Sequence, residues 1–322
     1  MPAERSGEPR KHGSIVLFLR DAGVALLFVV IILLSMFAFT GQWPPLVVIE
    51  SQSMMHNKNS ISEIGAIDTG DLVLVQKVDE PSDIKTYMDG FTSDYRTYGD
   101  YGDVVIYKNK GSETTTPIIH RAIIYLEYNP SDLSYKSESL RDAPSYKWTT
   151  SDKSDAWDHL TSMLIIYYVS YDQLTITIDI PSIRAHTASD SQGVPQSAFV
   201  TKGDNNPTID QLSSAFSPVQ MSWIVGKARG EIPWFGLLKL WSTHTIHSEA
   251  PSNSVRNLWI SVALIVISPV FVDIALTVKE RREISRRRLK EAREARRAHK
   301  MEKEMEVEDN EPFADETARR RY

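Results

Sequence analysis

Residues 24–40 read VALLFVVIILLSMFAFT and contain no charged side chain. With Gly23 and residues 41–43, this run approaches the roughly 20 residues that a membrane-spanning helix needs. A second apolar run, residues 258–278, contains a single acidic residue, Asp273. We therefore expect transmembrane helices at 24–43 and 258–278, on either side of a domain formed by residues 44–257.

Basic residues flank both apolar runs on the sides that face away from the central segment. Arg10, Lys11 and Arg20 precede the first run, and the triplet Arg286–Arg288 follows the second. Lys and Arg are enriched in cytoplasmic segments of membrane proteins. We therefore expect a multi-pass protein whose N-terminus (1–23) and charged tail (279–322) are cytoplasmic and whose residues 44–257 are extracytoplasmic.

A cleaved signal peptide is the rival interpretation of the first run, because Ala38-Phe39-Thr40 offers a loose small-x-small site. The apolar stretch is longer than the about 7 to 15 residues of a signal peptide's apolar region, and its flank is weakly basic. A retained anchor is therefore the prediction.

The composition of the central segment excludes several classes of protein. Residues 44–257 contain 26 Asp and Glu against 17 Lys and Arg, so the segment is acidic and unsuited to nucleic acid. The chain has no cysteine, which excludes disulfides, thiol catalysis and Cys-ligated zinc.

Short runs rich in Val, Ile, Thr and Tyr, bounded by Gly, Asp, Asn and Pro, predict strands along the central segment. Residues 127–172 are instead polar and rich in Ser and Asp, and we interpret them as an inserted subdomain. The prediction is a mainly β exterior domain with one insertion. The expected strands are Leu46–Glu50, Leu72–Gln76, Val104–Tyr107, Ile118–Ile124, Leu174–Ile180 and Ala198–Thr201.

Ser53 lies about a dozen residues beyond the first apolar run and is followed along the chain by His120, Asp204 and Asp210. A serine hydroxyl needs a neighbouring base to become a good nucleophile, and a histidine near its ordinary pKa can serve as that base. A carboxylate then holds the other ring nitrogen. Lys202 and His56 are the alternative bases.

These residues carry a resemblance to type I signal peptidases, of the branch found in archaea and the endoplasmic reticulum. The matching segments occur in the family's order and include the residue pair His120-Arg121, where bacterial members have lysine before the arginine. The segments are the first anchor, Ser51-x-Ser53-Met54, Asp68-Thr69-Gly70-Asp71-Leu72-Val73, Gly102-Asp103-Val104-Val105, His120-Arg121 and Gly203-Asp204-Asn205-Asn206 with Asp210.

The resemblance implies a signal-peptidase-like β fold and a Ser53-His120-Asp210 triad, with Asp204 as a supporting carboxylate. It also implies an oxyanion site formed by the Ser53 backbone N–H and the Ser51 hydroxyl. Two positions depart from the family pattern: Gln52 replaces its glycine, and His56 replaces its proline. Sequence leaves open which of Asp204 and Asp210 contacts His120.

The function implied by the resemblance is a serine endopeptidase that removes signal peptides from exported preproteins after small residues. Its expected partners are such preproteins, the lipid bilayer and the protein-export channel, with no metal, organic cofactor or nucleic acid. The second anchor favours an archaeal cell membrane, with the endoplasmic reticulum membrane as the alternative. The rival functions are a membrane-tethered binding protein or an envelope protein with an inactive, peptidase-like domain.

Overall fold

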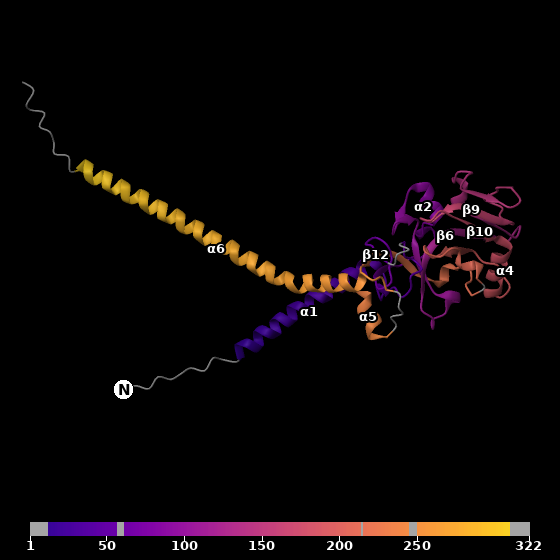
Figure 1. The fold of residues 1–322 in the computed structure, drawn as a ribbon, viewed down its shortest axis with the longest axis horizontal. Helices are drawn as coiled ribbons and strands as arrows, with labels where there is room; N and C mark the ends of the chain where they lie inside the picture. Colours follow the sequence, from indigo (N-terminus) through magenta and orange to yellow (C-terminus); the bar gives the residue numbers. More distant parts are fainter. Residues whose placement is uncertain (1–11, 57–60, 214, 245–249, 310–322) are drawn as a thin grey trace, which may run out of the picture. The chain divides into compact units, whose positions relative to one another are not determined.

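A computed structural model describes residues 12–56, 61–213, 215–244 and 250–309 (Figure 1). The chain divides into two units, residues 1–258 and residues 259–322. The first unit contains antiparallel sheets with several helices, whereas the described part of the second belongs to a single long helix.

The main sheet of the first unit has seven strands, all joined in antiparallel pairs. Its order is β1, β2, β12, β5, β6 and β11, and β7 pairs with the last residues of β6. The strands are β1 (Leu46–Val48), β2 (Leu72–Gln76), β5 (Val104–Tyr107), β6 (Ile118–Asn129), β7 (Ser134–Lys136), β11 (Ala198–Lys202) and β12 (Ile224–Ile232).

Two smaller sheets and several helices complete the first unit. A three-stranded sheet has the order β10, β9, β8, and β3 pairs with β4. Their bounds are β3 (Arg96–Thr97), β4 (Asp100–Tyr101), β8 (Trp148–Thr150), β9 (Met163–Val169) and β10 (Leu174–Asp179). The helices are α2 (Tyr87–Ser93), α3 (Glu138–Arg141), α4 (Ile180–Asp190) and α5 (Gly236–Ser242), with 3-10 turns η1 (Pro81–Asp83), η2 (Asn109–Gly111), η3 (Asp210–Leu212) and η4 (Met221–Trp223).

Local sequence signals explain where two of these helices begin. Thr86 caps α2, because its side chain accepts a hydrogen bond from the Asp89 N–H while the Asp89 carboxylate accepts one from the Thr86 N–H. Asp179 caps α4 by accepting a hydrogen bond from the Ser182 N–H, and Pro181 follows in the first turn.

The prediction of a mainly β domain is correct in part. Each of the six predicted runs overlaps a strand, namely β1, β2, β5, β6, β10 and β11, and β6 continues to Asn129, inside the range assigned to the insertion. The helices between the strands nevertheless make the fold mixed α/β, with antiparallel sheets. The sequence pattern that predicted the strands did not predict short capped helices such as α2.

Residues 127–172 form part of a larger excursion from the main sheet. The predicted boundary at residue 172 falls between β9 and β10, which are paired strands, and α4 follows β10 directly. Leu164 and Ile178 of this excursion share one hydrophobic cluster with Ile123 and Val200 of the main sheet. The excursion therefore packs on the main sheet as part of a common core (Figure 1).

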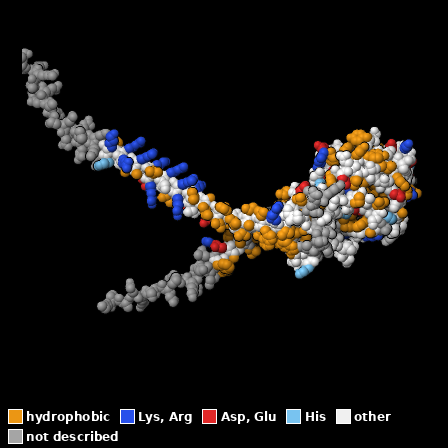
Figure 2. Space-filling view, viewed as in Figure 1, with side chains coloured by type: hydrophobic (Ala, Val, Ile, Leu, Met, Phe, Trp, Pro, Cys, Tyr) orange, Lys and Arg blue, Asp and Glu red, His pale blue; other side chains and the backbone are white. Residues whose placement is uncertain are grey.

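Two helices are long and apolar enough to cross a membrane: α1 (His12–Thr40), over Phe18–Thr40, and α6 (Ser254–Asp309). The 23 residues of the α1 segment extend about 35 Å, enough for a hydrocarbon core of about 30 Å. Most apolar side chains of both spanning segments are exposed, as expected for a lipid-facing helix. In α6, Lys and Arg side chains follow the apolar part (Figure 2).

Candidate active site

Strand β6 presents two neighbouring candidate residues on opposite faces of the main sheet. Consecutive side chains of a strand alternate between faces, so His120 and Arg121 point in opposite directions. His120 lies beside Val105 of β5, and Arg121 lies beside Lys202 of β11. The two faces therefore carry separate polar networks, which we call the His120 face and the Arg121 face.

On the His120 face, a histidine and a carboxylate form a buried pair. Nδ1 of His120 lies 2.6 Å from Oδ2 of Asp210, with side-chain exposures of 8% and 3%. The same Oδ2 accepts hydrogen bonds from the Thr201 hydroxyl at 2.7 Å and the Tyr107 hydroxyl at 3.1 Å. Three donors around one oxygen suit an ionised carboxylate, which can only accept.

Tyr107 stays a neutral donor in this network. Burial raises the pKa of the Tyr107 phenol, and the neighbouring Asp210 carboxylate raises it further. The imidazole of His120 is consequently held through Nδ1. Its Nε2 atom has no hydrogen-bond partner among the described residues and is free to take a proton.

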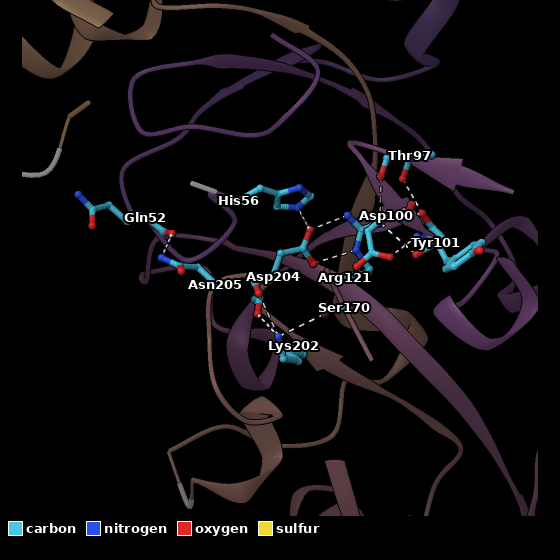
Figure 3. A network of polar contacts seen from close by, with 12 residues as sticks. Gln52, His56, Thr97, Asp100, Tyr101, Arg121, Ser170, Lys202, Asp204 and Asn205 are labelled. Atoms are coloured by element: carbon cyan, nitrogen blue, oxygen red, sulfur yellow. Dashed lines mark hydrogen bonds and ion pairs between the residues drawn. The ribbon is translucent and has the colours of Figure 1, made fainter. Parts of the chain in front are cut away.

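On the Arg121 face, Asp204 binds a fully buried arginine (Figure 3). Nε and Nη2 of Arg121 lie 2.8 and 2.6 Å from the two carboxylate oxygens of Asp204, a bidentate pair. The other arginine donors reach backbone carbonyls of Thr97, Tyr101 and Gly102. Burial raises the pKa of Asp204, but Arg121 and His56 outweigh it and hold this carboxyl well below its usual range.

Lys202, an alternative base, is also fully buried on the Arg121 face. Its ammonium group donates to the backbone oxygens of Gly203 and Asp204 and to the Ser170 hydroxyl, at 3.0, 3.1 and 3.3 Å (Figure 3). Burial lowers the pKa of Lys202. Since these partners fix the ammonium within the turn that follows β11, its geometry is that of a structural cation.

The loop that carries Ser53 docks on the same turn. The Asn205 N–H donates to the Ser53 carbonyl at 2.8 Å, and the Asn205 side-chain amide donates to the Gln52 carbonyl at 3.1 Å. A Cβ atom at Gly203 would lie 2.7 Å from the Ser53 carbonyl oxygen, so this close approach requires glycine. The segment Gly203-Asp204-Asn205 is thus a platform for the serine loop.

The hydroxyls of Ser51 and Ser53 lie 3.1 Å apart, within hydrogen-bond distance. The backbone N–H of Ser53 has no partner among the described residues, so it can donate to a bound group. Among the described residues, Ser53 and His120 share no hydrogen bond. The structure therefore joins the serine loop to the turn that carries Asp204, and it pairs His120 with Asp210 on the other face of β6.

His56, the other alternative base, pairs with Asp204. Its Nε2 atom lies 2.7 Å from Oδ2 of Asp204, and its ring stacks on Tyr171 with centroids 4.8 Å apart. Within the described part of the chain, two His–Asp pairs therefore lie beside β6, one on each face.

Sequence analysis did not identify Tyr107, Thr201 or Tyr171 as members of these networks. Tyr107 and Thr201 were assigned only as members of predicted strands. Alternation along the strands could have placed both on the His120 face, because Tyr107 pairs with Ile118 and Thr201 with Ala122. Tyr171 lies in the excursion and carries no local signal.

Within the described part of the chain, no group of three or more His, Asp or Glu side chains is arranged to hold a metal ion. A comparison with protein-family models finds none that matches this chain, and a comparison with curated proteins finds no match. Arguments about function therefore depend on the geometry of the two polar networks and on the sequence motifs that form them.

Proposed function

We propose that this chain is a membrane-bound serine endopeptidase that removes N-terminal signal peptides from exported preproteins. The single observation that carries the proposal is the buried His120–Asp210 pair, with Nδ1 held at 2.6 Å and Nε2 without a described partner. A histidine held in this way can accept a proton from a serine hydroxyl and later return it.

The proposed reaction begins with attack of the Ser53 hydroxyl on the scissile carbonyl. Nε2 of His120 takes the hydroxyl proton, and Asp210 stabilises the imidazolium that results. The proton then passes to the leaving amine, and a water molecule hydrolyses the acyl-enzyme. Hydrogen bonds between catalytic groups are often long before substrate binds, so we assign the contact between Ser53 and His120 to the substrate complex.

The developing oxyanion needs hydrogen-bond donors close to the nucleophile. The proposed donors are the Ser53 N–H and the Ser51 hydroxyl, and in their support the Ser51 hydroxyl lies 3.1 Å from the Ser53 hydroxyl. Removal of one such donor typically costs about 3 kcal/mol of transition-state stabilisation. Ser51→Ala is accordingly expected to lower turnover about 100-fold.

Attachment of the chain to a membrane supports the proposed substrate class, because such a preprotein is itself threaded through a bilayer. The site lies between the two candidate spanning segments in sequence, and Ser53 follows the first one by about a dozen residues. We propose that residues 44–257 lie outside the cytoplasm of an archaeal cell, with the reticulum membrane as the alternative, and that both termini are cytoplasmic. An extended substrate would bind by strand addition beside the serine loop.

Incubation of the purified full-length chain with a preprotein tests the proposal. In lipid vesicles, the native chain should release the signal peptide after a small residue, and mass spectrometry of both products should locate the cut. Ser53→Ala should abolish release, whereas Ser131→Ala, a matched change at an exposed serine, should not. Equal cleavage by the native and Ser53→Ala chains would reject the proposal, and binding without cleavage would favour an inactive, peptidase-like binding protein.

A further inference from the structure

His56 links the serine loop to the framework of the site at a position three residues after Ser53. Its side chain is 14% exposed, and Nε2 lies 2.7 Å from Oδ2 of Asp204. Asp204 is itself held by Nε and Nη2 of the fully buried Arg121 (Figure 3). The loop is thereby tied to a charge pair whose two side chains are fully buried.

A second contact fixes the plane of the imidazole. Tyr171 stacks on His56 with ring centroids 4.8 Å apart and planes inclined by 28°. Tyr171 lies in the turn that joins β9 to β10, closed by a hydrogen bond from the Gln173 N–H to the Ser170 carbonyl. The excursion from the main sheet therefore reaches the loop that bears the nucleophile.

The remaining side of the ring is closed by backbone. A Cβ atom at Gly99 would lie 3.0 Å from Nδ1 and 3.1 Å from Cε1 of His56. Gly99 also has φ +80°, a conformation that glycine adopts readily. With Nε2 bound to a carboxylate and Nδ1 close to Gly99, the His56 ring is placed as a fixed donor and not as a proton shuttle for Ser53.

We propose that His56 is a positioning residue that locks the serine loop onto Asp204, and that Tyr171 holds its ring in the required plane. The inference rests on the proposed peptidase function, because it gives the lock a catalytic consequence. The lock acts together with the hydrogen bonds from Asn205 to Ser53 and Gln52. It fixes the backbone of Ser53 where its hydroxyl and N–H are needed.

Kinetics of three substitutions test the catalytic consequence. His56→Leu removes the donor at similar size, and we expect kcat to fall about tenfold or more with KM changed less than about threefold, because misplaced groups slow the chemical step. His56→Gln can still donate to Asp204 and should restore most of the lost kcat. Tyr171→Ala should fall between them. The control is His159→Leu, at an exposed histidine paired with Asp132, which should match the native chain.

Hydrogen exchange tests the lock without relying on activity. The N–H groups of Met55 and Asn205 donate to the Gln52 and Ser53 carbonyls, so they should exchange slowly in the native full-length chain. His56→Leu should speed exchange at these two sites and leave β6 unchanged, whereas His56→Gln should retain the slow exchange.

Each outcome decides the matter. Native kcat in His56→Leu, or a lower kcat with unchanged exchange at Met55 and Asn205, would overturn the inference. If the native chain shows no Ser53-dependent cleavage, the proposed function fails by itself. The exchange experiment then tests the proposed lock independently of activity. Faster exchange in His56→Leu supports the lock, and unchanged exchange overturns it.

Discussion

Nδ1 of His120 contacts Oδ2 of Asp210 at 2.6 Å, although 90 positions separate the two residues in the chain. Asp204, the other candidate carboxylate, binds Arg121 and His56 instead. The two aspartates of one sequence motif thus lie in different networks, and their substitutions should affect turnover and stability differently.

Asp210→Asn should lower turnover about 10,000-fold while the domain stays folded, because an amide favours the wrong tautomer of the imidazole. The amide oxygen can still accept from Tyr107 or Thr201, so the effect on unfolding should be small by comparison. Single-turnover cleavage of one preprotein, with thermal unfolding of the same sample, measures both quantities. Near-native turnover would remove Asp210 from the proposed mechanism.

Asp204→Asn should act mainly on stability. It leaves the charge of Arg121 buried and unpaired, which typically costs about 3 to 5 kcal/mol of unfolding free energy. The double change Asp204→Leu with Arg121→Met removes both charges and should recover much of that loss. Urea denaturation of the detergent-solubilised chain, followed by tryptophan fluorescence, gives the comparison. Equal stability of Asp204→Asn and the native chain would contradict the expectation.

Lys202→Met should retain turnover within about tenfold of native per folded molecule, because its ammonium is bound to carbonyls of the turn and to Ser170. His120→Ala should abolish turnover in a folded chain. The measurement is the cleavage rate normalised to the folded fraction. A loss of activity confined to Lys202→Met would instead favour a serine–lysine mechanism.

Asp71 should make stability depend on pH. Burial raises the pKa of Asp71 to about 7 from an ordinary value of 3.8, against the opposing hydrogen bonds from the Trp234 and Asp68 N–H groups. Between these values the folded state binds a proton that the unfolded state has lost, so the unfolding free energy should fall as pH rises through this window. Asp71→Asn should make this fall smaller.

The check on Asp71 is the change in unfolding free energy between pH 4.5 and pH 7.5 in the native chain and in Asp71→Asn. Asp142→Asn, at an exposed carboxylate, is the matched control and should behave like the native chain. An identical pH dependence in all three chains would show that Asp71 titrates normally.

The proposed orientation predicts which parts of the chain a protease can reach. In sealed cells without a wall, trypsin should cut at the exposed Lys153, in the turn between β8 and β9, and should spare an epitope placed after Arg288. Immunoblots of intact and lysed cells distinguish the two sites. A protected Lys153 with an accessible tail would reverse the orientation.

The parts of the fold that were predicted from sequence are those that depend on local pattern. Alternating β-branched residues locate strands such as Leu72–Gln76, and an uncharged run locates the helix over Phe18–Thr40. The ordered motifs, and the family resemblance that they carry, made Ser53, His120 and the two aspartates candidates. Local pattern predicts a helix or a strand, but it does not predict the path by which a later segment of the chain returns to contact that helix or strand.

The pairing of side chains across the sheet depends on the path of the chain between strands. Asp210 reaches His120 because η3 folds back over Thr201 and Tyr107, which supply two of the three donors to its carboxylate. His56 reaches Asp204 across 148 positions, and Tyr171 meets it from the excursion. No local pattern encodes contacts of this range, so sequence left the partner of His120 open and treated His56 only as a rival base.

Because His120 and Arg121 are neighbours that serve opposite faces of β6, the strand cannot change length by one residue without exchanging them. A single deletion before His120 would turn an imidazole toward Asp204 and a guanidinium toward Asp210, which would disable both networks at once. Homologous chains should therefore vary in length within the loops around the sheet, and insertions or deletions inside β6 should be strongly selected against.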